Sequence, residues 1–185
     1  MAPLSKRYTV PALDLSAPAD AVKALESPNN AVRYLDWQRL HAWGATAVPA
    51  LEKMYHDHNS RFRARALWLL SKLPSAGNGY IQQALKDKDE DIRITAIRAA
   101  EELKEDMAPV VQQVVNDPSA QVRREAAIAM RHCSSPAAAG LWAQLAEQYD
   151  GKDRWYLEAL GIGADRQWDA YFAAWLQQVG PAWNT

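Results

Sequence analysis

Four histidines and one cysteine are the side chains of this sequence that would be most useful for metal binding or nucleophilic catalysis. The histidines are His41, His56, His58 and His132. His56 and His58 flank Asp57 and can offer two ligands, but a structural zinc site uses four, usually Cys and His. Cys133 follows His132 directly, and adjacent residues on a helix point in different directions. We therefore expect no metal site and no catalytic cysteine.

The glycines and paired carboxylates do not form a catalytic set either. Gly161 and Gly163 lack the preceding strand and the third glycine of a dinucleotide-binding loop, so this stretch is expected to end a helix. Glu101 and Glu102 fall at positions that we expect to be solvated. The sequence therefore predicts neither an enzyme activity nor a cofactor.

An arginine recurs every thirty residues and indicates how the chain is organised. Arg33, Arg63, Arg93 and Arg123 are thirty residues apart, and Arg154 follows one residue late. An apolar residue precedes each of the first four. A fixed period of this size predicts a repeat array, in which each unit buries its apolar face against its neighbours.

An aspartate stands six residues before three of these arginines. This offset lets a carboxylate in the turn reach the guanidinium at the start of the next helix, where the planar fork of arginine bridges several acceptors. We expect Arg93 to be more buried than Arg98, and the loss of Arg98 to cost little stability. The predicted structural ladder consists of Asp57, Arg63, Asp87, Arg93, Asp117 and Arg123.

The bulk composition fits a short array. The chain has 185 residues, of which 49% are hydrophobic, and its formal net charge is −1. This charge indicates no general affinity for nucleic acid or for anionic membranes. No apolar run approaches the roughly 20 residues of a membrane span, and the N-terminus shows no signal-peptide pattern.

Apolar residues recur with helical spacing along most of the chain, and no stretch alternates with a period of two. We expect an all-α, right-handed superhelix of about five helix pairs plus one terminal helix. Ser16 is the expected N-cap of the first helix. The expected domains are a leader over residues 1–15, a repeat domain over 16–180 and a tail over 181–185. Its repeats are expected at 17–43, 45–73, 77–103, 106–132 and 136–162, with a half repeat at 165–180.

Three segments resemble short HEAT repeats of the kind also found in phycobilisome lyases. They are AVPALEKMYHDHNSRFRARALWLL, QQALKDKDEDIRITAIRAAEEL and MAPVVQQVVNDPSAQVRREAAIAM. In that family the first helix of a repeat carries a proline and lies on the convex side, as Pro49 and Pro109 would here. A Val-Arg pair opens the second helix, which lines the concave side. The resemblance implies a HEAT-repeat solenoid.

The first and fifth repeats depart from this pattern. Ser27 replaces the turn aspartate of the first repeat, and Asp36 stands where a small apolar residue is usual. Gln148 takes the aspartate position of the fifth repeat, and Asp153 replaces the apolar residue before Arg154.

A second resemblance is to the HEAT segment of large bacterial membrane-bound dehydrogenase-like proteins. It rests on RARALWLL, DEDIRITAIRAA, PSAQVRREAAIAMRH and GKDRWYLEALGIGADRQWDAYFAAWL. In those proteins a β-propeller precedes the repeats and a c-type haem domain with a C-x-x-C-H motif follows them. Cys133 alone cannot make the two thioether links that haem attachment needs. The resemblance implies the repeat segment of a longer, extracytoplasmic (periplasmic) protein.

Aromatic and basic residues recur at two positions of the second helices. Such residues are enriched at the energetic centres of protein interfaces. The alternative is that Trp68 and Trp155 pack over repeat junctions. The expected concave binding surface consists of Tyr34, Trp68, Arg98, Arg124, Arg131 and Trp155.

The C-terminal helix carries an apolar stripe. Together with Trp142, we expect Trp168 and Trp175 to lie in the core, and Tyr171 and Trp183 to be exposed. Terminal repeats normally present a polar outer face. We therefore expect the chain to be a piece of a longer protein and a monomer, unless this end self-associates.

The function predicted from these features is a non-catalytic scaffold that binds a protein partner or positions flanking domains. The alternative is a nucleic-acid-binding module similar to HEAT-like alkylpurine DNA glycosylases. That alternative needs a basic groove, whereas Glu101, Glu125 and Glu158 dilute the arginines of the second helices. We expect no nucleic acid and no membrane insertion.

Overall fold

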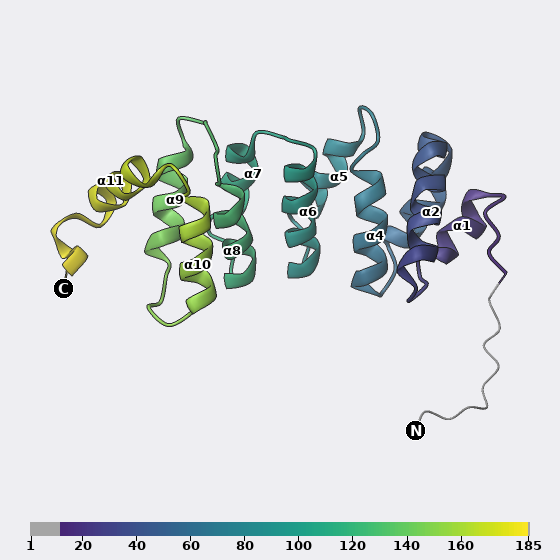
Figure 1. Ribbon diagram of the computed structural model, residues 1–185, viewed down its shortest axis with the longest axis horizontal. Coiled ribbons are helices and arrows are strands. Elements are labelled where there is room, and N and C mark those ends of the chain that lie inside the picture. The colour runs from purple at the N-terminus through teal and green to yellow at the C-terminus, as the bar shows by residue number, and fades with distance from the viewer. Residues whose placement is uncertain (1–11, 185) are drawn as a thin grey trace, which may run out of the picture.

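The computed structural model describes residues 12–184 and consists almost entirely of helices (Figure 1). No strand occurs among these residues, and the prediction of an all-α solenoid is confirmed. Residues 1–11 of the expected leader and Thr185 of the expected tail lie outside the described part. The helices are α1 (Pro18–Ala24), α2 (Asn30–Trp43), α3 (Val48–Tyr55), α4 (Ser60–Leu70), α5 (Gly77–Ala84), α6 (Glu90–Glu102), α7 (Met107–Val114), α8 (Ala120–Ala129), α9 (Ala138–Glu147), α10 (Arg154–Gly163) and α11 (Trp168–Val179), with the 3-10 helices η1 (Gly44–Ala47) and η2 (Gly180–Asn184).

The helices form two layers. The second helices of the repeats, α2, α4, α6, α8 and α10, stand side by side in chain order (Figure 1), and each contacts the next. Among the first helices, α3 and α5 make no such contact in the described part of the chain, nor do α5 and α7. In the middle of the array, from α3 to α8, the second helices are therefore the more closely spaced layer. We call the side formed by the second helices the second-helix face.

Small residues at one repeated position allow this close spacing. Ala66, Ala96 and Ala126 are thirty residues apart, and each is fully buried. Larger side chains, among them Leu67 and Ile97, fill the space between the layers and are also fully buried. Because neighbouring repeats share this packing, the core is continuous along the array.

Each second helix of the first four repeats begins with a side-chain cap. The cap oxygen accepts a hydrogen bond from the backbone N–H two residues later, at 2.9–3.2 Å. Asp153 does the same for α10. These caps satisfy backbone donors that a helix start leaves without a partner. The thirty-residue row of caps, which the sequence analysis did not identify, consists of Asn29, Asn59, Asp89 and Ser119.

One expectation about an individual helix is wrong. Ser16 does not cap α1, because its hydroxyl donates to Asp14 Oδ1 at 2.6 Å and Ala17 is the N-cap. The stretch from Gly161 to Gly163 ends a helix as expected, because Gly163 is the last residue of α10. Gly163 is also needed for packing, since a Cβ there would lie 2.1 Å from the backbone oxygen of Ala127 on α8.

The aromatic residues of α11 also lie differently from the prediction. Tyr171, expected at the surface, is buried and donates from its hydroxyl to the backbone oxygen of Met130 at 3.2 Å. Trp142 is buried as expected, whereas Trp168 is 51% exposed and meets the ring of Trp142 edge-on. Tyr171 takes the inward place because its hydroxyl reaches a backbone acceptor that an indole at position 168 does not. Trp175 is partly buried.

Arginines and aspartates connect consecutive repeats in the middle of the array. Arg93 donates from Nε and Nη2 to the two carboxylate oxygens of Asp117, at 2.7 and 2.8 Å. Asp117 also accepts from the backbone N–H of Ser119 at 2.8 Å, and Arg93 Nη1 donates to the backbone oxygen of Asp87 at 2.7 Å. Arg93 thus holds the turn of its own repeat through a carbonyl and that of the next repeat through a carboxylate.

One repeat earlier, Arg63 pairs with Asp87 through Nη2 alone, and its Nε donates to the backbone oxygen of Tyr55 at 3.1 Å. At the C-terminal side the series stops, because Gln148 stands in the aspartate position and Arg123 instead lies 5.7 Å from the ring centroid of Tyr156. Arg154 forms only an exposed pair with Glu158.

Among the described residues, the first repeat makes no arginine–aspartate ion pair of this kind with the second. Arg33 Nη1 donates to the backbone oxygen of Ser27 at 2.6 Å, as Arg93 and Arg123 do within their own repeats. Arg33 nevertheless makes no ion pair with Asp57 or with any other carboxylate in residues 12–184. The carboxylate of Asp57 accepts from the backbone N–H of Asn59 and contacts His58. The positive charge of Arg33 is therefore not neutralised within the described chain.

Asp36 occupies the position that alanine takes in the next three repeats. It is fully buried, and neither carboxylate oxygen has a hydrogen-bond partner among the described residues. Burial raises its pKa from 3.8 to about 7, because a charged form without partners is disfavoured away from water. The first repeat thus contains a source of instability that the others lack.

Removal of Arg93 should destabilise the array strongly. Arg93→Ala leaves the buried carboxylate of Asp117 without its cation, a change that costs on the order of 3–5 kcal/mol. Arg154→Ala, in an exposed pair, should change the free energy of unfolding by less than about 0.5 kcal/mol. Urea unfolding of the two variants measures this difference, and equal effects would contradict the ladder.

Arg98 is not the neutral control that the sequence suggested. It forms two 2.7 Å hydrogen bonds with Glu125, whose side chain is only 12% exposed. Loss of Arg98 would therefore also leave a shielded carboxylate without its partner.

Asp36→Asn should stabilise the protein more at pH 8 than at pH 4. The pKa of Asp36 is raised in the folded state, so its ionisation does not penalise folding below pH 3.8, and the penalty grows until the pH passes about 7. The full penalty is roughly 4 kcal/mol. Asp169→Asn, at an exposed site, is the control. Denaturant unfolding of both variants from pH 4 to 8 tests this, and a stability difference that does not change with pH would refute it.

Candidate functional site

The second-helix face contains two hollows of about 580 Å³ each. The first, which we call the N-terminal hollow, is lined by Leu25, Asn30, Arg33, Tyr34, Trp37, Arg65, Trp68, Lys72 and Glu102. The second, the C-terminal hollow, is lined by Ile94, Arg98, Gln121, Arg124, Glu125, Ile128, Trp155, Glu158, Ala159 and Ile162. Five of the six residues of the expected concave surface therefore lie in these hollows, in two separate groups.

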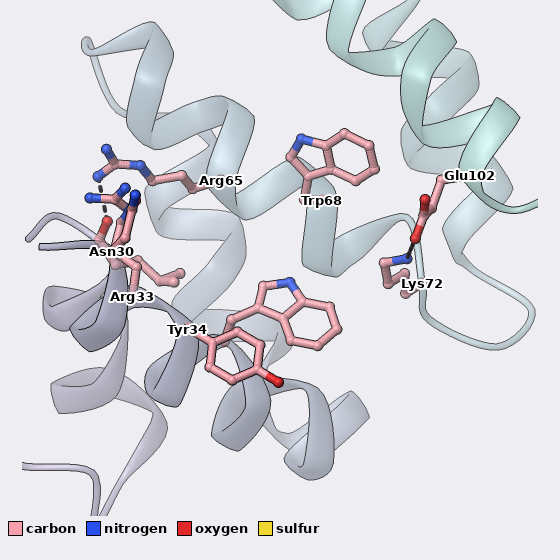
Figure 2. A pocket seen from close by; sticks show the side chains of 9 residues that line it. Asn30, Arg33, Tyr34, Arg65, Trp68, Lys72 and Glu102 are labelled. Atoms are coloured by element: carbon pink, nitrogen blue, oxygen red, sulfur yellow. Dashed lines mark hydrogen bonds and ion pairs between the residues drawn. The ribbon is translucent and has the colours of Figure 1, made fainter. Parts of the chain in front are cut away.

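Aromatic rings form much of the N-terminal hollow. Tyr34 is 61% exposed, while Trp37 and Trp68 are partly buried against the core. Trp37 is held by stacking on His41, with ring centroids 5.0 Å apart. Figure 2 shows Tyr34 and Trp68 on separate helices, with their rings bordering the same opening. A planar or apolar group entering the hollow would meet aromatic surface from both α2 and α4.

Two arginines stand at one side of these rings (Figure 2). Arg33 and Arg65 each use Nη1 on a backbone carbonyl, of Ser27 and Leu25 respectively. These bonds hold the guanidinium groups in place. A guanidinium has five N–H donors, and neither arginine forms an ion pair with a carboxylate in residues 12–184.

The charge at this side of the hollow is therefore crowded. Burial, followed by the charges of Arg33 and Arg61, lowers the pKa of Arg65, and only Glu26 acts in the opposite direction. Repulsion between like charges makes the site favourable for an anion.

The opposite side of the hollow carries both signs of charge. Lys72 Nζ lies 3.3 Å from Glu102 Oε1 and 6.0 Å from the ring centroid of Trp68. The excess positive charge is therefore confined to the side formed by the two arginines.

The C-terminal hollow has an apolar floor and neutralised charges. Trp155 is 71% exposed at its edge. Arg98 forms its bidentate pair with Glu125, and Arg124 Nη1 lies 3.4 Å from Asp153 Oδ2. This hollow offers contact area and no free cation for an anionic group. Its apolar floor consists of Ile94, Ile128, Ala159 and Ile162.

Arg131 lies outside both hollows. Its Nε and Nη2 donate to Asp165 Oδ2 at 3.1 and 2.8 Å, and His132 Nε2 is 3.1 Å from the same oxygen. Hydrogen bonds from Arg131 and His132 lower the pKa of Asp165. Arg131 thus helps to attach the turn before α11 to α8, apart from the other five residues of the expected concave surface.

The sequence analysis missed two residues of the N-terminal hollow, Trp37 and Arg65. Trp37 follows Tyr34 by three residues, and Arg65 precedes Trp68 by three. Residues three or four apart share a helix face. This spacing was the signal that could have identified both.

Two absences complete the description of residues 12–184. No group of three or more His, Cys, Asp or Glu side chains there is arranged to hold a metal ion. None of the helices described has both the length and the apolar character that a membrane span requires.

Comparison with known proteins supports the repeat architecture. A family model described as HEAT repeats matches residues 77–161, the region from the start of α5 into α10. No curated protein matches the chain. The resemblance to the repeat segment of membrane-bound dehydrogenase-like proteins stays a prediction from the sequence. The described residues form an all-α solenoid, and the similarity to HEAT repeats covers residues 77–161 of it.

Proposed function

We propose that this protein is a non-catalytic scaffold that docks a partner protein on its second-helix face. The observation that carries the proposal is the N-terminal hollow, where Tyr34, Trp37 and Trp68 lie beside arginines that have no carboxylate partner. Aromatic residues and arginine are the types most enriched at the energetic centres of protein interfaces. The hollow is also preformed, since its guanidinium groups are already held by backbone carbonyls.

The exposure of large apolar side chains on this face supports docking. Tyr34 and Trp155 are 61% and 71% exposed. Moving such rings out of water lowers the free energy, so their exposure favours contact with another molecule. Contiguous exposed apolar surface with a polar rim is typical of interaction sites. A partner that runs along the second helices would meet the N-terminal hollow first and the C-terminal hollow next. The same contacts would also suit a flanking domain of a longer chain.

A catalytic role has little support at these hollows. General acid–base catalysis needs a titratable group within reach of the substrate. Of the carboxylates that line the hollows, Glu102 pairs with Lys72, Glu125 with Arg98 and Glu158 with Arg154. Asp36 has a pKa of about 7, but it is fully buried and lines neither hollow.

Photo-crosslinking tests the docking face. A benzophenone side chain introduced at Tyr34 or Trp68 should form covalent adducts with a partner when the protein is returned to its native cells. The same group at Lys53, exposed on the first helix α3, is the matched control. Adducts are detected by mass spectrometry. Equal or greater crosslinking from Lys53 would contradict a partner site on the second-helix face.

Nucleic acid is the second candidate partner, because bases can stack on aromatic rings beside arginines. The neutralised C-terminal hollow weighs against it, since a strand needs cations along its path. We expect a fluorescent DNA oligonucleotide to show no specific binding at physiological salt. Tight binding that weakens steeply as salt is raised, as phosphate contacts require, would favour this second function.

A further inference from the structure

The N-terminal hollow differs from the rest of the second-helix face in its charge. In the C-terminal hollow, each arginine that lines the cavity has a carboxylate within 3.4 Å. In the N-terminal hollow, Arg33 and Arg65 have none in the described chain. Arg33 makes no ion pair with the turn aspartate of the next repeat, whereas its counterparts Arg63 and Arg93 do.

We propose that the N-terminal hollow recognises an acidic peptide segment that carries an aromatic side chain. The aromatic side chain would lie on the rings of Tyr34, Trp37 and Trp68, and adjacent carboxylates would accept hydrogen bonds from Arg33 and Arg65. This inference rests on the proposed docking function and specifies the partner's chemistry.

The donors that remain on the arginines match a carboxylate. In Arg33 and in Arg65, Nη1 donates to a backbone carbonyl, and Nε and Nη2 have no acceptor in residues 12–184. Nε and Nη2 are the pair that binds carboxylate oxygens in parallel, as Arg93 does with Asp117. The protein thus already contains the same recognition geometry between its own side chains.

The charge distribution favours a peptide over a nucleic acid strand. The positive side of the hollow is short, and beyond it lie Glu102 and then the paired residues of the C-terminal hollow. A strand would bring a phosphate to each of these positions, whereas a peptide can place one or two carboxylates at the arginines and apolar side chains elsewhere. The formal net charge of −1 also gives no general attraction for polyanions.

Fluorescence anisotropy with defined peptides tests the inference. The probe is a short labelled peptide in which glutamates flank a phenylalanine. The controls are the same peptide with glutamine in place of each glutamate, the same peptide with alanine in place of phenylalanine, and labelled oligothymidine. We expect the acidic aromatic peptide to bind and each peptide control to bind about tenfold or more weakly, because a charge-assisted hydrogen bond and a buried ring each account for such a factor.

Variants locate the site. Arg65→Gln and Tyr34→Ala should each weaken binding of the peptide about tenfold. Tyr34 is mostly exposed, so its variant does not depend on the folding risk that Arg65→Gln carries. Arg124→Gln and Trp155→Ala, on the C-terminal hollow, are the matched controls and should leave the affinity unchanged.

Several outcomes would overturn the inference. These are no binding of the acidic peptide, equal binding of the glutamine peptide, tighter binding of oligothymidine, or equal loss of affinity in the C-terminal variants. Dimerisation in sedimentation velocity that Tyr34→Ala abolishes would assign the hollow to a second copy of the chain instead. If Tyr34 and Trp68 crosslink a partner but the acidic peptide does not bind, docking stands and only the partner's chemistry is wrong.

Discussion

The bidentate contact between an arginine and the turn aspartate of the next repeat is the interaction on which the relative position of the repeats depends. Helices of about ten residues are marginal alone, so each pair relies on its neighbours for its position. The Arg93–Asp117 contact is made inside the array, where water does not compete, and Arg93 also holds the backbone of its own turn. One side chain thus couples two turns and, through them, the starts of two second helices.

The ion pairs that arginines make with carboxylates also determine which arginines keep an unpaired charge at the surface. Arg63 and Arg93 are neutralised by aspartates, and on the second-helix face Arg98 and Arg124 are neutralised by other carboxylates. Arg33 keeps the bond to its own turn but lacks the rung to Asp57. It therefore remains a fixed cation beside Tyr34 and Trp37. The first repeat departs from the pattern twice, since it also buries Asp36 where its neighbours have alanine. Departures from the residue preferences of a fold are expected mainly at functional sites, where the sequence serves more than stability.

The repeat architecture could be predicted from the sequence, because it depends on spacing. The thirty-residue arginines and the helical periodicity predicted an all-α solenoid, and the described residues form one. The prediction failed where a residue's environment is set by a neighbouring element. Tyr171, rather than Trp168, is buried because the oxygen of Met130 lies in reach.

The candidate site shows the same division. Tyr34 and Trp68 were found from their repeat positions, and both line the N-terminal hollow. Arg65 could have been placed on this face from its spacing to Trp68, but no periodicity indicates its bond to the carbonyl of Leu25, forty residues away. Arg131 lies outside both hollows, and its partner Asp165 belongs to a turn beyond the regular repeats. Pairing of charges between repeats is a property of the folded array and has to be read from the structure.

A pair of double-mutant cycles would test this account most directly. The first cycle combines Arg93→Ala with Asp117→Ala, and the second combines Arg33→Ala with Asp57→Ala, with the free energy of unfolding measured for every variant. The account predicts a coupling energy on the order of 2–3 kcal/mol for the first pair and a value near zero for the second. Equal coupling energies, or none between Arg93 and Asp117, would contradict both the ladder and the free charge of Arg33.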